Sequence, residues 1–89
     1  MSILQDTINT YGTDNQLMVA VEELSELQKE ICKAFRGQLN EQNLIEEIAD
    51  VLIMIEQVKM IYGIRDKDVD VEIGVKLSRL HSRLHDGTL

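Results

Sequence analysis

The sequence predicts an all-α protein: one helical domain over residues 1–89, with four helices in a bundle-like arrangement. Proline is absent, and the aliphatic residues recur at helical spacing rather than in strict alternation. The aromatic content is only 3%, which argues against a β-sandwich rich in turns. A chain of this size buries only about 60–65% of its unfolded surface, so its own core is marginal.

The first predicted helix is short, from about residue 3 to residue 11, and Gly12 ends it. The second runs from about residue 14 to residue 36. Thr13 is its predicted N-cap, with Gln16 reaching back in a capping box, and Gly37 is a natural C-cap. The expected apolar stripe of this helix is Leu17, Val21, Leu24, Leu27 (with Gln28 beside it), Ile31 and Phe35.

The third predicted helix begins near Asn40 or Asn43 and continues to Tyr62. Asn43 with Glu46 is a second candidate capping box. Because only residues 38–40 connect the second and third helices, we expect the two to be antiparallel neighbours.

Gly63 stops the third helix, and Asp66 can cap the fourth, which residues 86–87 close. The apolar stripe of the fourth helix is Val69, Ile73, Leu77, Leu80 and Leu84.

The third helix is apolar on nearly all sides. One side carries Ile48, Val51, Ile55, Val58 and Tyr62, and much of the rest carries Ile45, Leu52, Ile53 and Met60. A helix that is apolar all round is buried all round, and three short neighbours cannot cover it. We therefore expect a homo-oligomer, a dimer or a dimer of dimers, with this helix against another copy of the chain.

Acidic residues interrupt that apolar helix. At about 100° per residue, Glu47 and Asp50 fall on the same side as Val51. The second helix carries Glu23 and Glu26 at the same i, i+3 spacing, and antiparallel pairing would bring the two pairs together. Either pair alone is equally well explained as a solvated helix face.

Four converging carboxylates would repel one another, and a hard divalent cation would remove that repulsion. Mg²⁺, with Mn²⁺ as the alternative, takes oxygen ligands and keeps several waters, whose positions a phosphate substrate can occupy. Such a cation acts as a Lewis acid and generates a nucleophilic hydroxide.

Other sites are less well supported. A di-iron bundle needs E-x-x-H pairs on two helices, and the sequence has none. His81 and His85, near the end of the fourth helix, suit a helix C-terminus electrostatically. Cys32, the only cysteine, can form no intramolecular disulfide and has no evident histidine partner. No glycine-rich phosphate loop is present.

The net charge of −7 argues against nucleic acid or an anionic membrane as a partner. The N-terminal residues lack the pattern of a signal peptide, and the longest apolar run, residues 51–55, is far too short to span a membrane. We expect a soluble cytoplasmic protein.

The segments Glu22-Glu23-Leu-Ser-Glu26 and Glu47-Ile-Ala-Asp50 resemble the E-E-x-x-E and E-x-x-D signature of the MazG-like all-α nucleoside triphosphate pyrophosphohydrolases. The flanking segments VEELSELQKEICKAFRG, NLIEEIADVLIMIEQV and VKLSRL are also similar to that family. The similarity extends over nearly the whole chain, and it favours the MazG-type helical fold.

The resemblance implies a Mg²⁺-dependent hydrolase that cleaves an NTP or dNTP between the α and β phosphates, giving the monophosphate and pyrophosphate. Such enzymes remove surplus or non-standard nucleotides. The positions carried over as catalytic Mg²⁺ ligands are Glu23, Glu26, Glu47 and Asp50. Glu22 belongs to the motif in a supporting role behind these ligands.

One position departs from the family pattern. Family members often carry an Asn a turn beyond the Lys of the last helix, but here Lys76 is followed by Leu80. Lys76, Lys33 and Arg36 are candidate phosphate contacts, and each is equally well explained as surface charge. The alternative function is a non-catalytic acidic module that binds a nucleotide or a basic protein. A plain structural dimer is a third.

Overall fold

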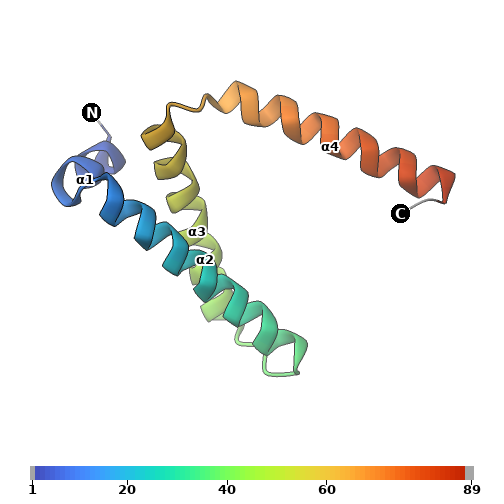
Figure 1. The fold of residues 1–89 in the computed structure, drawn as a ribbon. Helices are drawn as coiled ribbons and strands as arrows, with labels where there is room; N and C mark the ends of the chain where they lie inside the picture. The colour runs from blue at the N-terminus through green and yellow to red at the C-terminus, as the bar shows by residue number, and fades with distance from the viewer. Residues whose placement is uncertain (1, 88–89) are drawn as a thin grey trace.

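The computed structural model describes residues 2–87, and this part of the chain forms four α-helices and no strand. The helices are α1 (Ile3–Tyr11), α2 (Thr13–Phe35), α3 (Glu41–Tyr62) and α4 (Asp66–Asp86) (Figure 1). The predicted all-α class is confirmed. Residues 1, 88 and 89 of the predicted domain lie outside the described residues. Within residues 2–87, no helix combines the length and the apolar character that crossing a membrane requires.

α2 and α3 form an antiparallel hairpin, as the short connection predicts (Figure 1). Gly37, at φ +82°, turns the chain after α2. The Gln38 N–H donates to the Lys33 carbonyl at 2.9 Å, and the Gly37 N–H donates to the Ala34 carbonyl at 3.0 Å. This pair of bonds is a Schellman motif, which satisfies the last carbonyls of α2 and sets the exit of the chain toward α3.

The predicted helix caps are wrong in detail. α2 begins at Thr13 itself, and its N-cap is Gly12, which has no side chain to close a capping box. α3 is capped by Asn40, whose Oδ1 accepts from the Asn43 N–H at 3.0 Å, so Asn43 is a helical residue and not a cap. Asp66 is likewise the first residue of α4 rather than its N-cap. For α2 and α4 the N-cap is the residue just before the predicted one, whereas α3 is capped by Asn40, the other of its two predicted start positions.

The contact between α2 and α3, here called the seam, follows a heptad spacing on both helices. On α2 the buried and half-buried positions of this seam are Gln16, Ala20, Glu23, Leu27, Glu30 and Ala34. On α3 they are Leu44, Glu47, Val51, Met54, Val58 and Ile61.

The predicted apolar stripe of α2 is therefore displaced by one position from the face that the chain buries. Val21, Leu24, Ile31 and Phe35 are 58%, 52%, 53% and 93% exposed. Of the larger aliphatic residues of α2, Leu27 lies in the seam, whereas Val21, Leu24 and Ile31 remain on the adjoining face.

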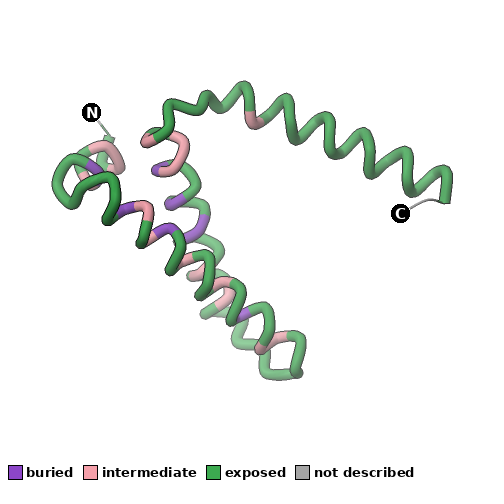
Figure 2. Tube along the Cα trace, viewed as in Figure 1, coloured by how far each residue is buried: buried purple, intermediate pink, exposed green. Residues whose placement is uncertain are grey.

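α4 leaves the end of α3 and extends away from the other helices (Figure 1). It has no buried residue within Asp66–Asp86, and Figure 2 shows it exposed along nearly all its length. The radius of gyration is 16.5 Å, whereas a compact chain of this length has about 12 Å. Close helix packing in one chain thus involves α1, α2 and α3.

Candidate metal centre

Three of the four predicted ligands meet at the seam. One carboxylate oxygen from each of Glu23, Glu47 and Asp50 lies within 4.8 Å of the other two. Glu23 comes from the seam face of α2, and the other two come from the facing side of α3, about one turn apart. Glu23 and Glu47 are half-buried, and Asp50 is exposed. The cluster is therefore anchored in the hairpin and open to solvent at one edge.

The electrostatics of this cluster favour protonation or a cation. Burial raises the pKa of Glu23 above its usual value, and the charge and hydrogen bond of neighbouring Asp50 raise it further. Burial also raises the pKa of Glu47, as do the charges of Asp50, Glu26 and Glu30. A bound divalent cation would reverse both effects by supplying positive charge to the same oxygens.

Two buried carboxylate oxygens have no hydrogen-bond partner among the described residues. They are Oε2 of Glu47 and Oε1 of Glu30. An unpartnered buried oxygen is costly, and a metal ion is one way to satisfy it. Several carboxylate oxygens around a partly open position are the donor set that Mg²⁺ and Mn²⁺ prefer. The residues present therefore fit such an ion.

Glu30 is an acidic neighbour of the cluster that the sequence motif does not include. It is only 7% exposed, and one of its oxygens pairs with Lys33 Nζ at 3.5 Å. Its charge acts on Glu47 across the seam. The signal that could have found it is the seam spacing, because Glu30 follows Glu23 by seven residues and thus shares its face.

Glu26 and Glu22 lie farther from the centre. Glu26 is exposed and is not one of the three clustered carboxylates, although its charge raises the pKa of both Glu23 and Glu47. Glu22 is also exposed, and its backbone carbonyl accepts a hydrogen bond from Ser25 Oγ at 3.0 Å.

The candidate phosphate contacts are scattered. Lys33 lies on α2 and is paired with Glu30. Arg36 is the C-cap of α2, in the hairpin loop. Lys76 lies on α4, at 3.9 Å from Glu72, and α4 does not approach the acidic cluster within one chain (Figure 1).

The two histidines of α4 interact with each other and with the helix backbone. The rings of His81 and His85 stack with centroids 4.1 Å apart, and His85 Nδ1 lies 3.0 Å from the His81 carbonyl oxygen. These contacts agree with a helix C-terminal role. Cys32 is exposed and free.

No protein-family model, curated protein or solved structure matches this chain. Its function is therefore inferred from its own residues and from the geometry of the cluster.

Proposed function

We propose that the protein is a Mg²⁺- or Mn²⁺-dependent nucleoside triphosphate pyrophosphohydrolase. Glu23, Glu47 and Asp50 are its central cation ligands, and Glu26 joins them when the ion is bound. The observation that carries this proposal is the meeting of three carboxylate oxygens within 4.8 Å beside a buried Glu47 oxygen that has no other partner. The resemblance to MazG-like enzymes supplies the reaction.

The protein contributes the ligands of the cation and a carboxylate that accepts a proton. When bound, the cation would polarise the phosphates and lower the pKa of an attacking water. A carboxylate of the acidic group that does not contact the ion would accept the proton of that water. The water oxygen then bonds to phosphorus as the bond between the α and β phosphates breaks, giving the monophosphate and pyrophosphate.

Substrate binding at this cluster depends on the cation. The acidic residues repel a bare polyphosphate, so the nucleotide must arrive with, or join, the bound ion. Lys33, paired with Glu30, is the candidate phosphate contact on the helix that carries Glu23.

The deciding experiment is pyrophosphate release from a panel of NTPs and dNTPs, with and without Mg²⁺. We expect release by the wild type only with the metal, and loss of at least 100-fold in the Glu47→Gln and Asp50→Asn variants. Glu46→Gln is the matched control, because Glu46 is exposed and lies outside the clustered carboxylates. Full activity in both cluster variants would overturn the metal-site assignment.

A non-catalytic nucleotide-binding module is the second candidate. The observation that favours it is the position of Lys76. Within one chain, α4 does not bring this lysine or any other basic side chain to the acidic cluster, where catalysis would need it. Nucleotide binding by calorimetry without pyrophosphate release in the same panel would support this candidate over the enzyme.

A further inference from the structure

The hairpin of α2 and α3 carries an apolar groove, defined here by Leu24, Val51, Met54, Ile55, Val58 and Val69. Its volume is about 230 Å³. The groove lies along the seam, next to the carboxylate cluster: Leu24 and Val51, which line the groove, are the sequence neighbours of Glu23 and Asp50. Ile55 lies about 140° from Asp50 around α3 and extends the groove away from the carboxylates.

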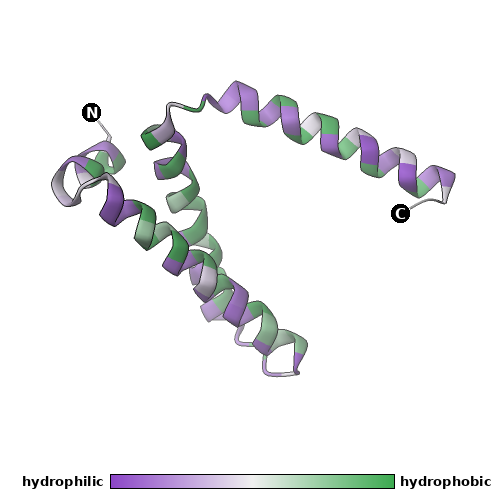
Figure 3. Cartoon of the chain, in the orientation of Figure 1, coloured by the Kyte–Doolittle hydropathy of each residue, from purple (hydrophilic) through white to green (hydrophobic). Residues whose placement is uncertain are grey.

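Exposed aliphatic residues extend this groove along both helices. Val21 and Ile31 share the side of α2 that carries Leu24, and they are 58% and 53% exposed. Ile48 and Leu52 share the side of α3 that carries Ile55, and they are 43% and 59% exposed. Figure 3 shows hydrophobic residues along both helices. An apolar surface of this extent is typical of an interface.

α4 carries a second apolar surface without a partner. Ile73, Leu77, Leu80 and Leu84 are 49%, 59%, 45% and 67% exposed. They recur at helical spacing and form one stripe. An amphipathic helix gains its stability mainly from packing that stripe, and nothing in the described part of one chain covers it.

The junction between α3 and α4 holds the two helices apart. Lys59 Nζ contacts Glu56 at 2.6 Å and Asp66 at 2.7 Å, which ties the last turns of α3 to the first residue of α4. Arg65 then makes two hydrogen bonds to Asp68, at 3.0 and 2.9 Å. From this junction α4 extends away from its own hairpin, so the natural cover for the groove is a helix from elsewhere.

We propose that α4 of one copy lies in the apolar groove of a second copy, and that the second copy returns its own α4 in the same way. The lengths agree: 21 residues in α4 span about 32 Å, and the 22 and 23 residues of α3 and α2 span about 33–35 Å. Val69, in the first turn of α4, lines the groove of its own chain. The exchange forms a closed two-fold dimer.

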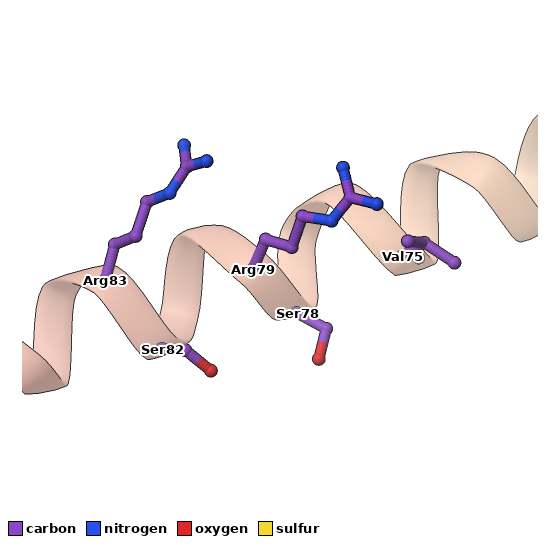
Figure 4. Close-up of a pocket in the computed structure, with 6 residues that line it drawn as sticks. Val75, Ser78, Arg79, Ser82 and Arg83 are labelled. Carbon is purple, nitrogen blue, oxygen red and sulfur yellow. The ribbon is translucent and has the colours of Figure 1, made fainter. Parts of the chain in front are cut away.

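The charges of the two surfaces are complementary. Residues 73–85 of α4 contain Lys76, Arg79 and Arg83 and no acid, whereas α2 and α3 together carry ten acids and three lysines. Figure 4 shows the side chains of Arg79 and Arg83 on the same side of α4, with Ser78 and Ser82 on another. α4 as a whole carries five acids and four bases, so the basic segment is its C-terminal part, residues 73–85, and this part favours encounter with an acidic hairpin, whereas two hairpins repel each other.

The test uses aspartate substitutions at exposed positions. Leu24→Asp disables the groove, and Leu77→Asp disables the stripe of α4. Met18→Asp and Val71→Asp are matched controls, because both residues are 58% exposed and lie on other faces of α2 and α4. Mass is measured by sedimentation and native mass spectrometry at tens of micromolar, and helix content by circular dichroism. We expect the wild type and both controls to have at least twice the 10.2 kDa chain mass, and each disabled variant to be a helical monomer.

Mixing the two disabled variants decides between modes of pairing. The mixture retains one intact contact, the α4 of the Leu24→Asp chain in the groove of the Leu77→Asp chain, so a mixed dimer should form. Labelling one variant with ¹⁵N identifies that species by mass.

A dimer of Leu24→Asp alone would show pairing of α4 with α4, and a dimer of Leu77→Asp alone would show pairing of hairpins. Either result, a monomeric wild type, or a mixture that stays monomeric would overturn the exchange. Pyrophosphate release is not part of this readout, so failure here is distinct from failure of the proposed activity.

Discussion

A carboxylate oxygen of Glu23 on α2 lies within 4.8 Å of a carboxylate oxygen of Asp50 on α3, the antiparallel neighbour of α2. The two acidic side chains are therefore close enough to repel each other. The proximity of Asp50 is one of the causes that raise the pKa of Glu23. The hairpin thus holds like charges together, which implies that a proton or a cation completes the cluster.

Neutralising one member of the cluster should stabilise the metal-free protein. We expect Asp50→Asn and Glu47→Gln each to raise the melting temperature in EDTA by about 2–5 °C, because repulsion is relieved while side-chain volume is kept. Thermal unfolding at one fixed protein concentration measures this. Glu46→Gln, at an exposed position beside the cluster, should change little. A lower melting temperature for both cluster variants would count against a repulsive site.

Adding the cation should reverse that order. A ligand that binds only the folded state stabilises it by about 2.7 kcal/mol at 100 times its dissociation constant. We expect millimolar Mg²⁺ or Mn²⁺ to raise the wild-type melting temperature and to leave Asp50→Asn unchanged. Mn²⁺ affinity, followed by electron paramagnetic resonance, should fall about 10-fold in Glu30→Gln, because this carboxylate neighbours a ligand. Equal affinities in all three proteins would place the ion elsewhere.

The stability of the metal-free protein should fall as pH rises above 4.5. The folded-state pKa values of Glu23 and Glu47 are raised above that usual value, so the folded protein binds more protons than the unfolded chain in this window. Their favourable contribution is complete below 4.5 and is lost as the pH passes the folded-state values. The difference in melting temperature between wild type and a Glu23→Gln/Glu47→Gln double variant, measured from pH 4 to 8 in EDTA, should follow this trend. A pH-independent difference would contradict it.

The junction of α3 and α4 should depend on Lys59. Hydrogen bonds to Asp66 and Glu56 raise the pKa of Lys59 to about 12. Its contribution is therefore fully present below the ordinary value of 10.5 and is lost as pH rises through 12. We expect Lys59→Met to lower the melting temperature at pH 7 and to speed proteolysis near residues 64–66 severalfold. Exposed Lys29→Met is the control. Unchanged proteolysis would mean that other contacts orient α4.

The helices and the carboxylate convergence could be predicted from the sequence, because glycines mark the ends of three helices and the acid spacing is local. The seam of α2 was predicted one position away from where it lies. Hydrophobicity identifies the most apolar face of a helix, here that of Val21 and Leu24, but not which neighbour covers it. Gln16, Ala20 and Glu30 are buried instead.

The extension of α4 could not be predicted either. Its stripe of apolar residues has the same appearance whether the helix packs on its own chain or on another. Lys59 of α3 pairs with Asp66 at the start of α4, and this contact depends on geometry at the junction rather than on any periodic pattern.

Few positions around α3 can be substituted without affecting a contact or a proposed site. One side forms the seam at Glu47, Val51 and Met54, Asp50 lies beside it, and Ile55 extends the groove to the next side. Only a narrow strip, represented by Glu46 and Ala49, faces solvent without a further contact or proposed role. Random substitutions should therefore be tolerated far less often on α3 than on α1, and the permitted ones should fall along that strip.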